Sequence, residues 1–311
     1  MTTPARPRPH AAQVGAGESM RASTHSRRWL ATGLAAIGVG LALVAVLGPL
    51  GTEAIDYRVT ETLRNQTIGL DIVSLVLVAP LSLLAAVLVL RGHLAGFAFA
   101  PAIGAYTSYM LLQYVLGPDY ASLPGNNERL FPLCLFLFAS GWMVALHAWR
   151  AVPAGELPRA GRPNRAIALV LAVLGFVTFV RYVPALADWM SAVPEDEVYV
   201  AGPDFAWAIA LLDLGIFLPA TVAACVGLFR GASWALKLTY AVVGWFGLVG
   251  AAVAAMAIAM YVNDDPTASG GNTVFMVALG VAFALFALFL YRPLARRPGD
   301  ASEAAATGLG K

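Results

Sequence analysis

Residues 210–231 read ALLDLGIFLPATVAACVGLFRG, an apolar run that carries one aspartate, Asp213, and one proline, Pro219. As a helix, a run of this length crosses the roughly 30 Å of hydrocarbon in a bilayer. A carboxylate at such a depth is unfavourable unless a partner meets it inside the bundle or in a cavity. The stretch therefore predicts a membrane-spanning helix with a polar contact at Asp213.

The composition of the whole chain agrees with a lipid environment. Of the 311 residues, 59% are hydrophobic and 12% are charged, against roughly 45–50% and about 25% in soluble domains. A soluble protein of this composition could not cover its surface with polar groups, so the lipid bilayer is the expected partner. No basic run with interleaved aromatic residues indicates nucleic-acid binding.

Eight apolar segments, each of a length that suits a transmembrane helix, follow one another along the chain. None alternates with the period of two that marks a barrel strand. The predicted spans are residues 29–50, 68–90, 94–116, 130–149, 166–187, 205–229, 233–261 and 273–291. The sequence thus predicts an all-α polytopic membrane protein.

The distribution of basic residues predicts the orientation of these spans. With the N-terminus inside, sixteen Lys and Arg residues fall on the cytoplasmic side and four, namely Arg58, Arg64, Arg129 and Arg181, on the outer side. Cytoplasmic loops carry such an excess of Lys and Arg, so both termini are predicted to be cytoplasmic. Arginine outnumbers lysine eighteen to two, which we associate with a GC-rich bacterial genome and hence with a bacterial cytoplasmic membrane.

The chain shows signs of an internal duplication. A shift of 139 residues superposes SLVLVAPLSLLAAVLVLRG (74–92) on DLGIFLPATVAACVGLFRG (213–231) without a gap, with six of nineteen positions identical. Because four helices return the chain to its starting side, we predict two parallel four-helix repeats. The predicted domains are a disordered cytoplasmic tail (1–28), the first unit (29–149), a basic cytoplasmic linker (150–165), the second unit (166–291) and a second disordered cytoplasmic tail (292–311).

Pro80 and Pro219 occupy matching positions in the second helix of each unit. A proline removes one backbone hydrogen bond and kinks its helix. In membrane helices such a kink commonly serves packing, and the alternative is a hinge, or a free carbonyl that faces a central cavity.

The candidate polar site is built around Asp213. Arg181, near the outer end of the fifth span, lies at a comparable depth and is the expected counter-ion. In the repeat register Ser74 takes the place of Asp213, and Asp71 lies one turn earlier on the same face of the second span. The two units thus each present an aspartate to the outer half of the bundle. A structural ion pair and a functional site both fit this pattern.

The third span carries a polar and aromatic stripe. Tyr106, Tyr109 and Gln113 stand at positions i, i+3 and i+7, which places them on one helix face. Tyr106 and Tyr109 lie deep enough in the span to be candidates for lining a pocket. Gln113, Tyr114 and Tyr120 fit the belt of amphipathic side chains at the membrane surface.

Signatures of catalysis and of cofactor binding are missing from the sequence. There is no GxxxxGK[ST], GxGxxG, HExxH or GxSxG motif, and Cys134 and Cys225 belong to no metal-binding cluster. His93 and His147 could hold a bis-histidine haem at the cytoplasmic side, but the second unit contains no histidine. We therefore expect no catalytic residue, no metal and no cofactor.

Three classes of function remain. The first is a transporter or permease of a small molecule or ion with a site at the repeat interface, because duplicated units, broken helices and intramembrane charge are typical of secondary transporters. The second is a non-catalytic scaffold, or a subunit of a larger complex with a membrane-protein partner, which the helices rich in small residues favour. A membrane enzyme or haem carrier is the third class, and the sequence lacks the cluster of side chains that it needs.

Overall fold

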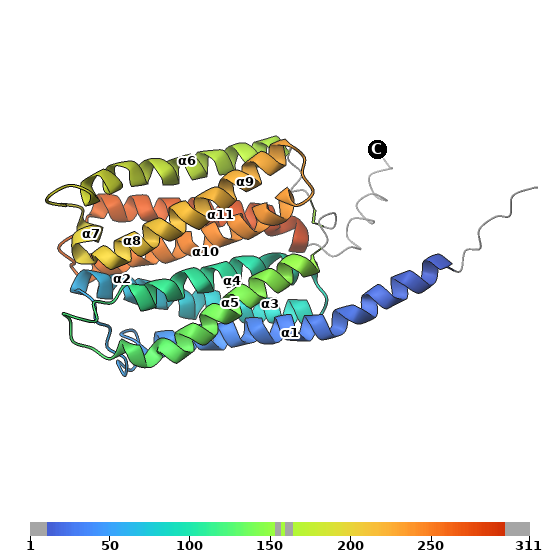
Figure 1. Ribbon diagram of the computed structural model, residues 1–311, viewed down its shortest axis with the longest axis horizontal. Coiled ribbons are helices and arrows are strands. Elements are labelled where there is room, and N and C mark those ends of the chain that lie inside the picture. Colours follow the sequence, from blue (N-terminus) through green and yellow to red (C-terminus); the bar gives the residue numbers. More distant parts are fainter. Residues whose placement is uncertain (1–10, 153–156, 159–163, 296–311) are drawn as a thin grey trace, which may run out of the picture.

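The computed structural model of the protein describes residues 11–152, 157–158 and 164–295. This described part is helical and holds no strand, and eight of its helices are long and apolar enough to cross a membrane (Figure 1). Those spans are Thr24–Leu47, Glu61–Leu90, Leu94–Leu116, Asn127–Ala151, Arg165–Trp189, Pro203–Phe229, Ala235–Val262 and Gly270–Leu294. The predicted all-α multi-pass architecture is therefore confirmed.

The spans are built from the following elements in chain order: α1 (Ala11–Leu47); α2 (Glu61–Val73), η1 (Ser74–Val78) and α3 (Ala79–Leu90) as one continuous rod; α4 (Leu94–Leu116); η2 (Asn127–Leu130) with α5 (Phe131–Ala151); α6 (Asn164–Trp189); the short α7 (Glu197–Ala201); α8 (Pro203–Leu212), η3 (Asp213–Phe217) and α9 (Leu218–Phe229) as a second rod; α10 (Ala235–Val262); and α11 (Gly270–Ala295).

Parts of the predicted tails and linker, residues 1–10, 153–156, 159–163 and 296–311, lie outside the described residues. The helix α1 begins at Ala11, within the predicted first tail, and α6 begins at Asn164, within the predicted linker. The disorder of the two tails stays a prediction.

The second span begins seven residues earlier than its apolar sequence indicates, at Glu61 instead of residue 68. Thr60 caps the helix by accepting a hydrogen bond from the Leu63 backbone N–H, and the acidic Glu61 lies in the first turn, where the helix dipole favours it. The first turns of α2 are polar, so hydropathy alone does not reveal them. The helix α2 packs against α10, and Asn65 and Gln66 in its first turns are buried.

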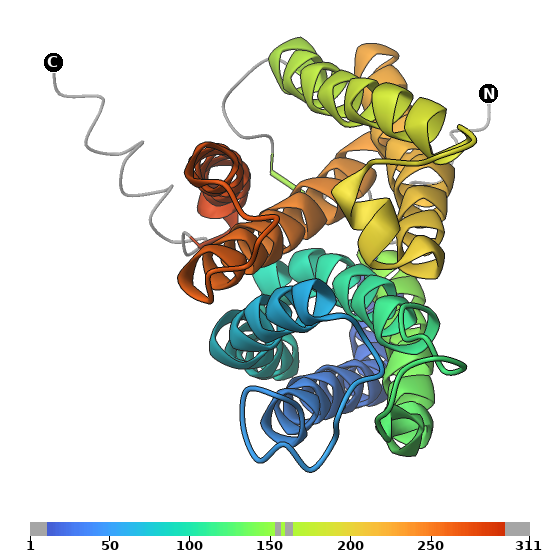
Figure 2. The same ribbon diagram turned by 90° about the vertical axis from the view of Figure 1, so that its left-hand side faces the viewer.

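The helices form two groups that meet along α2, α4 and α10. Viewed along the helices, the chain up to α5 gathers in the lower half of the picture and the chain from α6 onward in the upper half (Figure 2). In the first group α1 packs on α3 and α5, and α4 packs on α3 and α5; in the second group α6 packs on α9, and α10 on α9 and α11. Across the boundary, α10 packs on both α2 and α4.

Both long rods contain a π-helical turn at the same place in the 139-residue register. The turn η1 begins at Ser74 and η3 begins at Asp213, and each closes through a backbone hydrogen bond from the residue five positions later. The next residue is Pro80 in one rod and Pro219 in the other, which has no N–H to continue the regular ladder. A π-turn thus precedes each of the two prolines, and π-turns occur often at functional sites; the kinks themselves stay a prediction.

The two rods also end alike. Gly92 and Gly231 follow the last helical residues with φ values of 72° and 68°, a left-handed conformation that suits glycine. The residue after each glycine donates a backbone hydrogen bond to a carbonyl in the last turn of its helix. The matched features extend over the whole segment that the sequence aligned.

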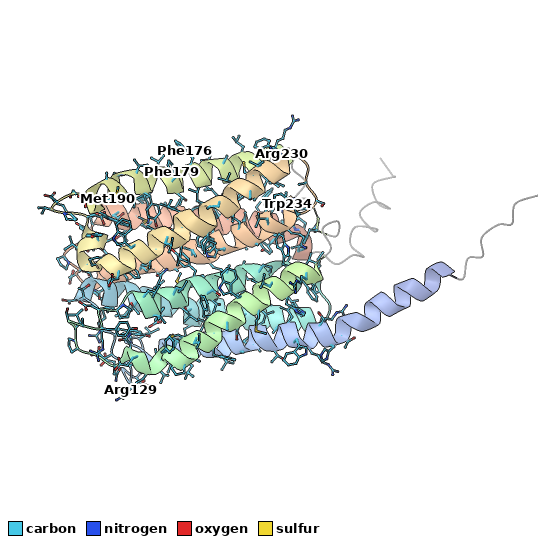
Figure 3. The ribbon with its side chains drawn as sticks, in the orientation of Figure 1. Arg129, Phe176, Phe179, Met190, Arg230 and Trp234 are labelled. Carbon is cyan, nitrogen blue, oxygen red and sulfur yellow. The ribbon has the colours of Figure 1, made fainter. Side chains whose placement is uncertain are left out.

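The outer faces of the bundle are apolar, as lipid contact requires. On α6, Phe176 and Phe179 are 66% and 49% exposed, and both side chains project away from the neighbouring helices (Figure 3). Exposed leucine, valine and phenylalanine side chains continue along α5 and α11. A membrane-spanning protein with these faces sits in a lipid bilayer, while the side on which the termini lie stays a prediction.

The two groups come into close backbone contact at Gly69 of α2. A Cβ atom on this residue would lie 2.5 Å from the backbone nitrogen of Met256 in α10. Backbone cannot yield as a flexible side chain can, so only glycine fits at this crossing.

We predict that Gly69→Ala lowers the free energy of unfolding by roughly 1–3 kcal/mol, the usual cost of overpacking a close contact. Thermal unfolding of the detergent-purified protein measures this change. Gly271→Ala in α11 is the matched control, because a Cβ atom there meets nothing within 4 Å. Equal melting temperatures for the two variants would show that the groups do not touch at Gly69.

Candidate functional site

Asp213 lies at the boundary between the two helix groups. The Tyr109 hydroxyl of α4 donates a hydrogen bond of 2.9 Å to Oδ1, and the Tyr182 hydroxyl of α6 donates one of 2.6 Å to Oδ2. Each carboxylate oxygen therefore has one donor, and the donors come from different groups. The half-buried Asp213 is the first residue of the π-turn η3.

The expected ion pair between Asp213 and Arg181 is not formed. Among the described residues, the ion pairs lie in the loops and helix ends at Arg58–Glu128 and Arg64–Glu53. Arg181 is exposed, and its guanidinium carbon lies 5.4 Å from the centre of the Tyr182 ring. Consecutive helical residues point about 100° apart, so α6 can turn Tyr182 toward Asp213 only by turning Arg181 away.

Aromatic side chains surround the Tyr109 ring. Phe217, at the end of η3, and Trp245 of α10 stack with ring centres 3.4 Å apart and planes 7° from parallel. Tyr109 meets both of them edge-on, at 5.3 and 5.4 Å. Rings packed at such angles hold each other in place. The hydroxyl of Tyr109 is thereby held in position against the carboxylate.

Asp71 forms a second polar centre, inside the first helix group. Its side chain is fully buried, and Oδ1 accepts a hydrogen bond of 2.5 Å from the Tyr114 hydroxyl of α4. Oδ2 has no hydrogen-bond partner among the described residues, and neither has the buried hydroxyl of Tyr57. Nearby, the Ser74 and Tyr106 hydroxyls lie 3.4 Å apart.

One helix, α4, supplies the tyrosines of both centres. Tyr106 and Tyr114 are two turns apart and face the first rod, at Ser74 and Asp71. Tyr109 follows Tyr106 by three residues, a rotation of about 60° to the next face, and reaches Asp213 on the second rod. The predicted stripe of Tyr106 and Tyr109 is therefore split between the two rods.

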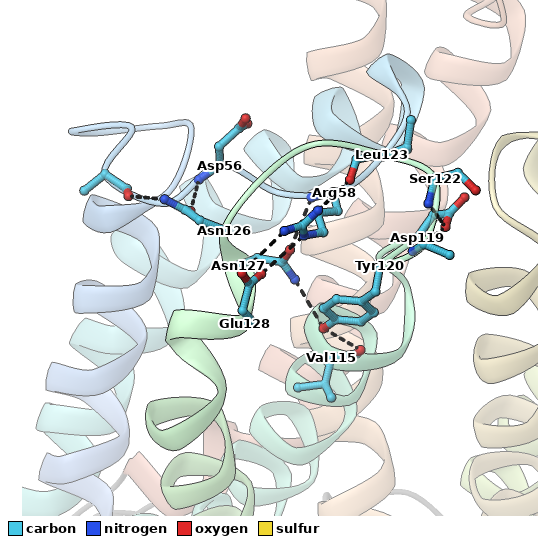
Figure 4. A network of polar contacts seen from close by, with 12 residues as sticks. Asp56, Arg58, Val115, Asp119, Tyr120, Ser122, Leu123, Asn126, Asn127 and Glu128 are labelled. Atoms are coloured by element: carbon cyan, nitrogen blue, oxygen red, sulfur yellow. Dashed lines mark hydrogen bonds and ion pairs between the residues drawn. The ribbon is translucent and has the colours of Figure 1, made fainter.

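Two loops cover the end of the first group that lies opposite the start of α1. We call this end of the bundle the far end. The Asp56 backbone N–H donates to Asn126, the Arg58 guanidinium donates to Glu128 and to the Leu123 carbonyl, and Asn127 donates to the Tyr120 hydroxyl (Figure 4). These bonds join the loop that follows α1 to the loop that follows α4. They fix the residues on both sides of Tyr57.

A cleft opens at the far end between the two groups. Its polar lining comes from Gln66 and Thr67 of α2 and from Gln113 of α4, and Phe205 of α8 closes the side of the second group. Tyr57 and Tyr114 form the part of the wall behind which Asp71 lies. The cleft therefore lies next to the Asp71 centre.

A polar contact also joins the loop between α10 and α11 to α2. Asp265 accepts hydrogen bonds from Asn65 at 2.9 Å and from Thr62 at 3.3 Å, both on α2. The Asn263 side chain donates to Asn65 at 2.8 Å. The two groups are thus connected by hydrogen bonds at their far end as well as by packing.

The two histidines considered for haem have other partners. The Nδ1 atom of His93 accepts a hydrogen bond from the Ala95 backbone N–H at the start of α4. His147 lies 2.6 Å from the Ser26 hydroxyl. The described residues hold no group of three or more His, Cys, Asp and Glu side chains that could bind a metal ion.

Sequence reasoning missed three residues of these centres. Tyr114 was assigned to the interfacial belt, although it bonds to Asp71. Tyr57 and Tyr182 stood out by no pattern, and only the neighbouring charge of Arg181 drew attention to that part of α6. A tyrosine within reach of an intramembrane carboxylate was the available signal, since the fold must supply such a carboxylate with donors.

Comparison with known proteins adds no relative: no protein-family model, no curated protein sequence and no solved structure matches the chain.

We predict that Tyr109→Phe and Tyr182→Phe each lower the free energy of unfolding by roughly 1–3 kcal/mol, because each leaves one oxygen of Asp213 without its donor. Thermal unfolding in detergent provides the measurement. In an Asp213→Ala background both substitutions are expected to lower the free energy of unfolding by a smaller amount, because the acceptor of the two hydrogen bonds is gone. Tyr261→Phe, at a position that is 55% exposed, is the control. Equal costs with and without Asp213 would contradict the hydrogen bonds.

A further prediction concerns Asp265, which lies in a loop outside the spans. Burial opposes its ionisation, but the hydrogen bonds from Asn65, Thr267 and Thr62 outweigh that effect and lower its pKa. A lowered pKa stabilises the fold at neutral pH, and this contribution is lost as the pH falls below about 4. Asp265→Asn is therefore expected to melt at a lower temperature than the wild type at neutral pH. Its melting temperature should then fall less than that of the wild type as the pH is lowered.

Melting curves of the wild type and of Asp265→Asn between neutral and acidic pH measure this difference. Asp264→Asn is the matched control, because Asp264 is exposed and asparagine tolerates its positive φ of 52°. Parallel pH profiles for the wild type and Asp265→Asn would argue against a stabilising role for the ionised Asp265.

Proposed function

We propose that this protein is a secondary transporter or permease of a small molecule or ion, and that protonation of Asp213 is its coupling event. One observation carries the proposal. Asp213 lies between two helix groups and is held by one tyrosine from each, with no cation paired to it in the described part of the chain. An ionisable side chain inside a membrane-spanning bundle marks a functional site by default.

The hydrogen bonds suggest how protonation would act. The ionised carboxylate accepts two charge-assisted bonds, which are stronger than bonds between neutral groups. A protonated carboxyl has lost that charge, so both bonds weaken. Of these two bonds, the Tyr109 bond crosses the boundary between the groups and the Tyr182 bond lies within the second group. Protonation therefore loosens the boundary as well as the contact between α6 and the second rod.

The same proposal includes an architecture of two parallel four-helix units, residues 29–149 and 166–291. The equal spacing of the π-turns, prolines and left-handed glycines in the two rods supports it. So does the packing of α4 on α10, the third span of each unit. Transporters built from such repeats place their sites at the repeat interface and move one unit against the other.

Three further parts of the proposal rest on the sequence. The protein is placed in a bacterial cytoplasmic membrane with both termini in the cytoplasm, because of its arginine-rich composition and its distribution of basic residues. The far end then faces outward. The polar cleft lined by Gln66, Thr67 and Gln113 becomes the outer entrance for a small-molecule substrate.

A scaffold, or a subunit of a larger membrane complex, is the second candidate. The observation that favours it is the exposure of α11. This helix packs mainly against α10, and only 11% of its most apolar 18-residue stretch is buried. A partner helix in the membrane could cover such a face, as lipid also could. This candidate requires no ligand and gives Asp213 a structural role.

We predict that Asp213→Asn abolishes substrate-driven charge movement. The protein is reconstituted in proteoliposomes on a solid-supported membrane and exposed to jumps of pH and of solutes, namely amino acids, sugars, organic acids, amines and inorganic ions. The wild type is expected to give a current whose size depends on pH, because Asp213 must bind and release a proton.

Asp204→Asn is the matched control for this experiment, because Asp204 is an exposed carboxylate on the same rod. It is expected to keep the current. The titratable and charged groups around Asp213 are Tyr109, Tyr182 and Arg181, so the tyrosine-to-phenylalanine variants should shift the pH profile without removing it. Equal currents from the wild type and Asp213→Asn would overturn the proposal, and silence of the wild type toward every solute would favour the scaffold.

A further inference from the structure

The Asp71 centre contains two polar atoms that the described residues leave unsatisfied. Asp71 is 0% exposed and Tyr57 is 6% exposed, yet neither Oδ2 of the aspartate nor the tyrosine hydroxyl has a hydrogen-bond partner. Leaving one such buried group without a partner typically costs about 1–3 kcal/mol, and more when the group is charged. Two of them side by side indicate that something else meets them.

Both atoms face the same point, next to Gly48. A Cβ atom built on Gly48 would lie 3.1 Å from Asp71 Oδ2 and 3.3 Å from the Tyr57 hydroxyl. The two oxygens therefore lie close together beside Gly48, and one small ion between them is within coordinating reach of both. Because residue 48 is glycine, no side chain occupies this point.

The charge around this point favours a cation with a single charge. Asp71 can supply one negative charge. The other titratable groups that face it are Tyr106 and Tyr114 of α4 and Tyr57, and Cys134 of α5 packs in the same cluster as Tyr57. Burial and the nearby Asp71 raise the pKa of Tyr57, so its hydroxyl remains neutral. A divalent ion would leave an unbalanced buried charge, whereas a monovalent ion would not.

The type of the ligand atoms further limits which cation can bind. Carboxylate and hydroxyl oxygens are hard ligands that suit hard cations. The point lies between Gly48, Asp71 and Tyr57, where even a Cβ atom on Gly48 would come within 3.3 Å of both side chains, so an organic ammonium ion with its carbon substituents fits less well. We propose that Asp71 and Tyr57 bind one alkali-metal cation at this point, which is reached from the far-end cleft past the Tyr57 ring.

The structure also provides an access route and a fixed position for Tyr57. Tyr57 and Tyr114 line the cleft on one side and approach Asp71 on the other. The hydrogen bonds of Asp56 and Arg58 to the next far-end loop hold Tyr57 from both flanks (Figure 4). Movement of this one ring would open the path to Asp71 while the two loops stay joined.

This site is independent of the proposed transport function, because it lies within the first helix group and does not include Asp213. The test uses the full chain, purified in a buffer whose only bulk cation is N-methyl-D-glucamine, at constant pH and ionic strength. Radioactive sodium and rubidium, the latter in place of potassium, are added in separate titrations. Saturable binding of one of them, at one ion per chain, is the expected result and identifies the cation.

The variants separate this site from other carboxylates. Asp71→Asn removes the charge, Tyr57→Phe removes the hydroxyl and keeps the ring, and Gly48→Ala fills the point while both oxygens remain. Loss of binding is expected for the first and third, and weaker binding for the second. Asp213→Asn and Asp119→Asn, the latter at an exposed loop position, are expected to bind as the wild type does.

Two results would overturn the proposal. One is the absence of saturable binding of both ions to the wild type, which needs no variant and so does not depend on whether a variant folds. The other is undiminished binding to Asp71→Asn or to a folded Gly48→Ala, as judged by its melting curve. If binding is found while Asp213→Asn still carries the wild-type current, the cation site stands and the coupling role of Asp213 falls.

Discussion

A carboxylate inside an apolar bundle needs hydrogen-bond donors or a counter-charge within reach, and in this protein one helix provides donors to both intramembrane aspartates. Tyr114 and Tyr109 of α4 donate to Asp71 and Asp213, respectively. This requirement places α4 in the middle of the bundle, in contact with α3 and α5 of its own group and with α8 and α10 of the other.

The two π-turns contribute to the same arrangement. Each begins at the residue that a tyrosine of α4 meets: Ser74 lies by Tyr106, and Asp213 by Tyr109. A π-turn inserts an extra residue per turn and so shifts the side chains that follow it around the helix axis. The proline after each turn prevents the rod from returning to a regular ladder at that point. The polar contact and the backbone irregularity are therefore features of one local structure.

The number and class of the helices could be predicted from the sequence because apolar length is sufficient to identify a membrane span. All eight predicted spans overlap those of the structure. The start of α2 could not be found in this way, because its first turns are polar and are stabilised by contact with α10. The partner of Asp213 was also out of reach: charge pointed to Arg181, but α6 is apolar around most of its circumference, so spacing along the chain did not show which face meets the bundle. The two repeats and the site chemistry remain proposals.

The two aspartates lie at similar distances from the starts of their rods but in different surroundings. Each is the tenth residue after the start of its rod, Asp71 after Glu61 and Asp213 after Pro203. Asp71 is enclosed by its own group and the loop at Tyr57, so relative motion of the groups leaves its neighbours in place. Asp213 has donors on both sides of the boundary, so the same motion must break or remake its bond to Tyr109. Although α4 carries donors to both aspartates, no hydrogen bond among the described residues links one carboxylate directly to the other, so each centre can be altered without removing a contact of the other.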